Sequence, residues 1–492
     1  MRRDVVILSV VLAAFTAGAV RAEDAAPVER VTRRDLAVAL QQLERAWRER
    51  PATDAARRRR VASAVSSSTM AFFVGQGAKA IDGLVGARLE LEGAAEPDPR
   101  AVALGRLRLQ VPPVLVRGGP DASASTVARL VALGPPPDLG PVELELSWTT
   151  ATPAPKAERA AALAGLSLPA FESRTTGRHR LVVRARAPRE GVTATWVGET
   201  VVVAHDTDAR LAACAAALER LAVPAGSPAG VQPTLLHLVA RSRAALRGEV
   251  GEVLVAVDDE LARVERALAA IRDAAAAGRP YRPTRADLAG DHHRATASGK
   301  TYRLYAPPPA VGPDGRPIER PVPVVLALHG LGGTEDMFAE AYGDGEALRL
   351  ATERGWALVA PQDVRAGRDV LDDVASLLPV DAARVHGVGH SMGAAALWDI
   401  AMATPDRFAS IAPIAGGRMS FGAPTWSALT GTAVLAVTAD QDFGRAATLR
   451  TAETSRAAGL AVETRVLPDL DHLLVVGEAM PLVFAFFDAH RR

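Results

Sequence analysis

The sequence has a single cysteine, few aromatic residues and almost no net charge. One cysteine, Cys214, excludes an intrachain disulfide and any metal site built from cysteines. Aromatic residues make up only 4% of the chain, which argues against a surface on which bases or sugars stack. A net charge of +1 provides no long-range field for nucleic acid or for an anionic membrane. We therefore expect no nucleic-acid partner.

Long apolar runs are also scarce, and the one that stands out lies at the start of the sequence. Arg2 and Arg3 precede the run Val5–Val20, which is shorter than the roughly 20 residues that cross a bilayer. Val20 and Ala22 then place small or short residues three positions and one position before a cleavage point after Ala22, as in a secretory signal peptide. We predict a leader over residues 1–22, a secreted or periplasmic protein, and no stable membrane insertion after cleavage. An uncleaved membrane anchor is the alternative.

The rest of the sequence has the composition of a folded globular protein, with 49% apolar and 23% charged residues in 492 positions. This length corresponds to about two to four domains. Changes in hydrophobic period and in proline and glycine content mark the boundaries. We predict a helical segment (23–84), a β-rich domain (85–205), a second helical segment (206–278), a linker (279–299) and a catalytic domain (300–492).

Alternating apolar and polar residues characterise the β-rich region. The alternation is clearest in Val142–Trp148 and Leu181–Ala185, and Thr195–Val203 is a β-branched run. These patterns predict antiparallel strands in a small sandwich or a helix-supported sheet.

The predicted linker contains an adjacent histidine pair, His292 and His293, and few apolar residues. Adjacent side chains point in different directions in most conformations, so two neighbouring histidines rarely share a metal ion without further ligands. We predict a solvated pair and no metal site.

The C-terminal part alternates short apolar runs with helical patterns. Runs such as Val324–Leu328 are apolar on both faces, as in strands buried between two layers of helices. The alternation predicts an α/β fold with a mainly parallel, doubly wound sheet and helices on both faces. The predicted strands are Tyr302–Ala306, Val322–Leu328, Ala357–Ala360, Arg384–Val388, Ser410–Ile414, Val434–Val437 and Val462–Leu467.

The segment Gly389-His390-Ser391-Met392-Gly393 directly follows one predicted strand and precedes an apolar helix. A sharp strand–turn–helix connection of this kind holds a serine hydroxyl above the sheet as a nucleophile. Side chains at positions 389 and 393 would collide with the turn or with the adjoining strand, so glycine is required at both. Ser391 is therefore the candidate nucleophile.

A second glycine-rich segment, His329–Gly333, follows the strand Val322–Leu328. Acyl transfer requires two backbone N–H groups directed at the developing oxyanion, and glycines allow a loop to approach the reacting carbonyl. We predict that the N–H groups of Leu331 and Met392 form this oxyanion hole. His329 is then structural and not a base.

The acid and the base should follow the serine in the order acid, then histidine. Asp440 and Asp442 both follow the predicted strand Val434–Val437, and His472 follows the last one. Asp442 has more freedom to reach across to the imidazole and is the preferred acid, with Asp440 as the alternative. In this interpretation His472 takes the Ser391 proton and Asp442 stabilises the imidazolium, with no metal and no cofactor.

These residues resemble the α/β-hydrolase superfamily, and within it the secreted esterases related to polyhydroxybutyrate depolymerases and feruloyl esterases, with the related predicted peptidases. The resemblance spans about residues 300–490. It is carried by Tyr302–Pro307, Leu328–Gly333, Asp381–Val385, Gly389–Gly393 and Pro405–Pro413. It assigns the nucleophile to Ser391 and the base to His472. Many relatives have glycine where this chain has Ala439, which leaves Asp442 and Asp440 both open.

Access to the site is expected to be open, because residues 417–434 are too few for a helical lid. The four aromatic residues that could line an acyl pocket are Phe338, Tyr342, Trp398 and Trp426, although core packing suits Trp398 better.

We predict a serine hydrolase that cleaves small-molecule or polymeric carboxylic esters. The alternatives are a serine peptidase of the same fold and a non-catalytic binding protein on a hydrolase scaffold. The sequence does not predict the oligomeric state.

Overall fold

A computed structural model describes most of the chain. The described residues are 8–10, 31–50, 54–92, 107–110, 113–116, 126–132, 142–150, 166–168, 176–187, 192–249, 251–311, 317–318, 320–419 and 425–492. They divide into two compact units. Unit 1 comprises Met1–Leu43, Ser67–Ala213 and Ala240–Ala262, and unit 2 comprises Glu44–Ser66, Cys214–Val239 and Arg263–Arg492. None of the helices in the described part of the chain is both long and apolar enough to cross a bilayer.

The predicted leader lies mostly outside the described residues. Of residues 1–22, the structure describes only β1 (Leu8–Val10), which pairs antiparallel with β5 (Val142–Thr150).

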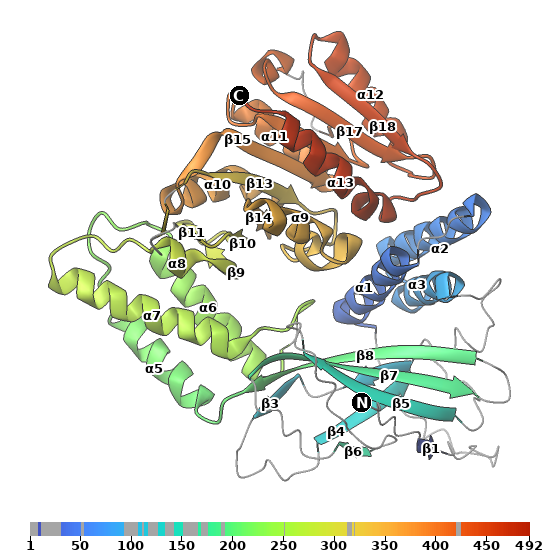
Figure 1. The fold of residues 1–492 in the computed structure, drawn as a ribbon, viewed down its shortest axis with the longest axis horizontal. Helices are drawn as coiled ribbons and strands as arrows, with labels where there is room; N and C mark the ends of the chain where they lie inside the picture. Colours follow the sequence, from blue (N-terminus) through green and yellow to red (C-terminus); the bar gives the residue numbers. More distant parts are fainter. Residues whose placement is uncertain are drawn as a thin grey trace. The chain divides into compact units, whose positions relative to one another are not determined.

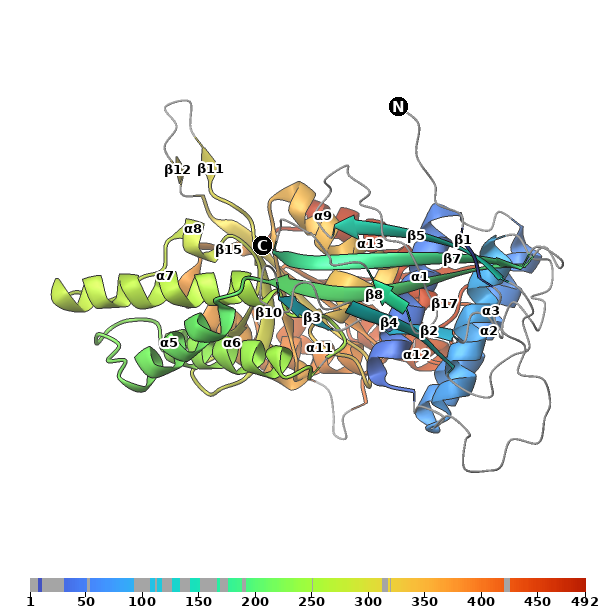
Figure 2. The ribbon, with the colours of Figure 1, turned by 90° about the horizontal axis from the view of Figure 1, so that it is seen from below.

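Unit 1 is built on a five-stranded sheet in the order β1-β5-β7-β8-β3. Strand β7 (Gly177–Ala187) lies between β5 and β8 (Val192–Val203) and is antiparallel to both (Figure 2). The alternating apolar and polar residues of β5 and β7 and the β-branched residues of β8 favour strands. The short β3 (Val114–Val116) pairs in parallel with β8 and forms an edge of the sheet. A second sheet contains β2 (Leu107–Gln110), β4 (Thr126–Ala132) and β6 (Leu166–Leu168).

Unit 2 is built on an eight-stranded sheet in the order β18-β17-β16-β15-β13-β14-β10-β9 (Figure 1). The six strands from β18 to β14 pair in parallel, whereas β10 and β9 extend the edge in antiparallel fashion. The strands are β9 (Gly290–Ala295), β10 (Thr301–Ala306), β13 (Val322–Leu328), β14 (Ala357–Pro361), β15 (Val380–His390), β16 (Ser410–Ile414), β17 (Ala433–Ala439) and β18 (Val462–Leu467). The predicted mainly parallel α/β sheet is confirmed.

Helices cover both faces of this sheet. The contacts of the strand side chains show which helices lie on which face. Val324, Leu326 and Leu328 of β13 share one core with residues of α10 (Gly367–Leu377) and α11 (Met392–Ala403). On the opposite face the His386 ring stacks on Phe487 of α13 (Leu474–Ala489), with ring centroids 4.8 Å apart. Burial on both faces accounts for the uninterrupted apolar runs in the central strands.

Other elements complete the two units. The remaining helices are α1 (Arg33–Glu49), α2 (Ala55–Phe73), α3 (Gly77–Glu92), α5 (Thr207–Glu219), α6 (Val231–Leu246), α7 (Val257–Ala276), α8 (Arg285–Leu288), α9 (Glu346–Arg354) and α12 (Arg445–Ala457). A two-stranded ribbon pairs β11 (Ala310–Val311) with β12 (Pro317–Ile318).

The edge strand β9 falls inside the segment predicted as a linker (279–299). Its sequence is polar, but its side chains find partners across the sheet. Arg294, for example, donates from Nε to the Tyr302 hydroxyl at 3.1 Å. His292 and His293 are each only 7% exposed, so the prediction of a solvated pair is wrong. The polar run was mistaken for a connection because its partners lie on strands and loops remote in sequence.

Candidate active site

Ser391 lies in a strained turn between β15 and α11. Its φ of 54° and ψ of −113° place a residue with a side chain in a region that normally favours glycine. Such a conformation costs about 1–3 kcal/mol and persists only where the surrounding structure enforces it. A Cβ atom added to Gly389 would lie 2.4 Å from the Gly393 carbonyl oxygen, and one added to Gly393 would lie 2.0 Å from the Leu328 carbonyl oxygen. Close backbone packing on both sides therefore enforces the turn.

The structure brings Ser391, His472 and Asp442 together at one edge of the sheet. The His472 Nε2 atom lies 2.9 Å from Ser391 Oγ, and its Nδ1 atom lies 2.6 Å from Asp442 Oδ1. Asp442 follows β17 and His472 follows β18, the strand next to it in the sheet. The carboxyl ends of parallel strands meet at the same edge, which explains how three distant segments converge.

Asp442 is held in place by three hydrogen bonds. Besides His472, the Thr438 hydroxyl donates to Oδ2 at 2.6 Å and the Gly444 N–H donates to Oδ1 at 2.7 Å. Burial alone would raise the pKa of Asp442, but these hydrogen bonds and the interaction with His472 together lower it below its ordinary value. The carboxylate is therefore ionised at neutral pH and can stabilise an imidazolium.

Asp440, the alternative acid, lies elsewhere in the same loop. Its side chain is exposed, and its carboxylate accepts a hydrogen bond from the Leu470 N–H at 3.4 Å. The imidazole contact is made by Asp442.

The predicted oxyanion loop lies directly against the serine turn. A Cβ atom added to Gly330 would lie 3.4 Å from Ser391 Cβ, and Leu331 is the next residue. Met392 is the first residue of α11, where backbone N–H groups have no partner within the helix. The arrangement leaves both predicted donor residues beside Ser391.

A buried hydrogen-bond chain connects this loop to the His472 loop. The His390 Nε2 atom lies 2.9 Å from the His472 carbonyl oxygen, and its Nδ1 atom lies 2.7 Å from the Tyr342 hydroxyl. Burial lowers the pKa of His390 well below its ordinary value, so the ring is neutral. Because a carbonyl can only accept, Nε2 carries the proton and Nδ1 accepts from Tyr342. The Tyr342 hydroxyl in turn accepts from the Gly330 N–H at 3.4 Å.

Sequence reasoning missed the roles of several residues around the site. His390 belongs to the segment Gly389–Gly393, but no role of its own was predicted for it. Tyr342 was expected to line an acyl pocket. Tyr342, Phe338 and Trp398 are each only 1% exposed, so they pack in the core. Phe443 was not singled out, yet its ring stacks on His472 with centroids 3.8 Å apart and is 51% exposed. Its position next to Asp442 was the one available signal.

A pair of buried carboxyl groups lies behind His472. Asp471 is fully buried, and burial raises its pKa to about 7 despite hydrogen bonds from the backbone of Leu473 and Leu474. Glu44 is 1% exposed, and burial, followed by the charge of Asp471, raises its pKa well above its ordinary value. Both groups belong to unit 2 although more than 400 residues separate them in the chain.

Polar contacts hold the segment Glu44–Ser66 against this part of unit 2. Arg59 pairs with Asp469 at 3.0 Å, and the Trp47 indole N–H donates to Glu478 at 2.6 Å. Part of the predicted N-terminal helical segment therefore packs around the loop that bears His472.

The pKa of Asp471 predicts how stability depends on pH. Between about pH 4 and pH 7 the folded chain keeps a proton on Asp471 that the unfolded chain has lost, so raising the pH through this window destabilises the fold by up to about 4 kcal/mol. We expect the urea midpoint of the wild type to fall between pH 5 and pH 8, and Asp471→Asn to reduce that dependence without abolishing it, because burial also raises the pKa of Glu44. The matched surface variant Asp372→Asn should keep the wild-type slope, and equal slopes for Asp471→Asn and the wild type would contradict the assignment.

Known proteins resemble parts of this chain. No protein-family model matches the chain. A curated protein described as "Putative esterase NocK", from Nocardia uniformis subsp. tsuyamanensis, is 31% identical over 152 residues, which cover 27% of this chain and 42% of that protein. The chain thus spans less than half the length of this relative.

Solved structures that resemble the chain include three esterases or related hydrolases. A thermostable esterase is 19% identical, with 42% of this chain and 64% of that chain covered and a TM-score of 0.35. The S-formylglutathione hydrolase FrmB of Staphylococcus aureus is 17% identical, with 40% and 97% covered and a TM-score of 0.34. The feruloyl esterase module from Clostridium thermocellum is 16% identical, with 38% and 83% covered and a TM-score of 0.31.

The parallel strand order, the serine at a strained strand–helix turn and the histidine after the last strand are the features that define one fold family. From β9 to α13 this chain has the α/β-hydrolase fold, and it resembles esterases.

Proposed function

We propose that the chain is a secreted serine hydrolase that cleaves carboxylic esters through an acyl-enzyme on Ser391. The observation that carries the proposal is the continuous contact from Ser391 Oγ through His472 to Asp442, with distances of 2.9 and 2.6 Å. Both distances allow hydrogen bonds, and this order of groups is that of an activated serine.

In the proposed reaction, Ser391 Oγ attacks the ester carbonyl carbon while His472 Nε2 takes the hydroxyl proton. The carbonyl oxygen becomes an oxyanion and accepts hydrogen bonds from the Leu331 and Met392 N–H groups. The intermediate collapses, the C–O bond to the alcohol breaks, and His472 returns its proton to the departing alkoxide. Water then attacks the acyl-enzyme with His472 again as the base, which releases the carboxylic acid and restores Ser391.

The surroundings of Ser391 favour a substrate with apolar groups near the carbonyl. Leu331 is 61% exposed and Phe443 is 51% exposed, although both are large apolar side chains. Phe443 stacks on His472 and Leu331 follows Gly330 beside Ser391, so both apolar side chains lie next to the reacting groups. Small-molecule or polymeric esters are the proposed substrates, and one curated relative carries the description "Putative esterase NocK".

Replacing the nucleophile tests the proposal directly. We expect Ser391→Ala to lower turnover of p-nitrophenyl acetate by about 10⁴-fold or more, because no other hydroxyl occupies this turn. The matched control is Ser427→Ala, which alters an exposed serine and should leave turnover unchanged. Full activity in Ser391→Ala would reject the proposal, and hydrolysis of amide but not ester reporters by the wild type would favour a peptidase.

The two candidate acids are distinguished by parallel amide substitutions. We expect Asp442→Asn to lower kcat by about 10³–10⁴-fold, because the imidazole loses the group that fixes its tautomer and stabilises its charge. Asp440→Asn should stay within about threefold of the wild type, since its carboxylate contacts a backbone N–H. Steady-state kinetics on one ester would decide, and the reverse ranking would transfer the role to Asp440.

The hydroxyl of Tyr342 is proposed to position the loops on either side of Ser391. Tyr342→Phe removes only the oxygen between Gly330 N–H and His390, so kcat should fall by about tenfold with KM nearly unchanged. Tyr305→Phe, in the same unit, is the control. A kcat equal to that of the wild type would show that the chain of hydrogen bonds does not position the site.

Export remains part of the proposal. The charged start, the apolar run Val5–Val20 and the cleavage point after Ala22 support it. Expression of the full chain in a bacterial host, followed by N-terminal sequencing of the periplasmic fraction, should give a product that begins at Glu23.

A further inference from the structure

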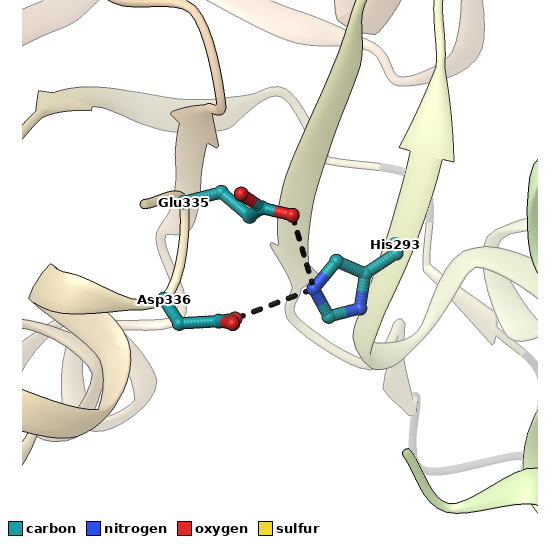
Figure 3. Close-up of side chains that lie close together, drawn as sticks. All are labelled: His293, Glu335 and Asp336. Carbon is teal, nitrogen blue, oxygen red and sulfur yellow. Dashed lines mark hydrogen bonds and ion pairs between the residues drawn. The ribbon is translucent and has the colours of Figure 1, made fainter. Parts of the chain in front are cut away.

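A compact group of three potential metal ligands lies between β9 and the loop after β13. His293 comes from β9, while Glu335 and Asp336 follow the oxyanion loop (Figure 3). Their exposed fractions are 7%, 7% and 8%. The three side chains point toward one another, and the dashed lines in Figure 3 join His293 to both carboxylates.

The spacing of the three ligand atoms is somewhat wider than that of a tetrahedral zinc site. His293 Nε2 lies 3.3 Å from an Asp336 oxygen and 3.8 Å from a Glu335 oxygen, and all three ligand atoms lie within 4.8 Å of one another. Ligands at zinc-bond lengths of about 2.1 Å around a tetrahedral ion are separated by about 3.4 Å. A small adjustment of side chains would therefore place one ion at equal distance from all three.

Glu335 provides an independent indication that a cation belongs here. Its Oε1 atom faces His293, whereas Oε2, the second oxygen of the same carboxylate, is buried and has no hydrogen-bond partner among the described residues (Figure 3). Leaving a buried carboxylate oxygen unsatisfied costs free energy that a bound cation would recover. The neighbouring guanidinium of Arg303 pairs with Asp336, Glu340 and Asp291. Within the described part of the chain, Glu335 lies 3.8 Å from His293 and forms no ion pair with Arg303.

Arg303 also explains how the ligand set is held in place. Its Nη1 atom donates to Asp336 Oδ1 at 2.7 Å, which orients that carboxylate toward His293. Hydrogen bonds to the carboxylates that bind a metal are a regular feature of metal sites, because they fix the geometry of the ligands. The carboxylates of Asp291 and Glu340 pair with the same guanidinium and offset its positive charge.

We propose that His293, Glu335 and Asp336 bind one divalent transition-metal cation, with Zn²⁺ as the best fit. A nitrogen donor together with two carboxylates suits zinc, whereas Mg²⁺ and Ca²⁺ prefer sites made wholly of oxygen donors. Solvent would complete the coordination. The ion would connect β9 to residues 335–336, four positions beyond Leu331, and so hold the base of the oxyanion loop.

The experiment uses the full chain stripped with dipicolinate and then titrated with ZnCl₂. We expect one equivalent of zinc per chain by mass spectrometry of the desalted protein, and a melting temperature higher by roughly 5–10 °C at a hundredfold excess over Kd. Replacement with Co²⁺ should give the visible absorption of a four-coordinate site. Titrations with MgCl₂ and CaCl₂ should give no comparable shift.

Two isosteric or near-isosteric variants test the ligands. Glu335→Gln and His293→Gln should each weaken zinc binding by more than about tenfold and abolish the thermal shift. Glu353→Gln, which alters an exposed glutamate of α9, is the matched control and should bind zinc as the wild type does. Circular dichroism checks that each variant is folded. A wild type that takes up no zinc, or ligand variants that retain the full equivalent of zinc, would overturn the proposal. The three residues would then form only a hydrogen-bonded cluster in which His293 contacts Asp336.

Discussion

The contact between His472 and its two neighbours is the interaction on which this structure depends. A single imidazole joins a serine held in a strained turn to a carboxylate held by three hydrogen bonds. The serine and the carboxylate are each held in place by their own neighbours. The backbone on both sides of Gly389 and Gly393 leaves no space for a side chain, and Thr438 and Gly444 fix the carboxylate. The parallel sheet is the frame that brings the two ends together.

Much of this could be predicted from the sequence, because the signals are local. The serine turn needs glycines two residues before and after Ser391, and parallel strands deliver Asp442 and His472 to the same edge as Ser391. The strand Val322–Leu328 was predicted with its observed limits because burial on both faces produces an uninterrupted apolar run. The choice between Asp442 and Asp440 was harder, since it depends on which carboxylate turns inward to meet Thr438.

The features that escaped prediction depend on contacts between distant segments. Strand β9 is polar and resembles a linker until its partners on β10 and on the loop after β13 are known. The hydrogen bonds from Gly330 through Tyr342 and His390 to the His472 carbonyl join residues that are 12, 48 and 82 positions apart in the sequence. Nothing in the local pattern near residue 44 indicates a carboxyl group buried beside Asp471. Each of these contacts joins segments of unit 2 that are distant in the sequence.

The most direct test of the account is to trap the acyl group. Wild-type protein mixed with p-nitrophenyl acetate and quenched in acid within the first turnovers should gain the mass of one acetyl group, and peptide mapping should place it on Ser391. Acetyl groups found only on lysines, or no covalent adduct while ester is consumed, would contradict the central claim that the hydroxyl beside His472 carries the reaction.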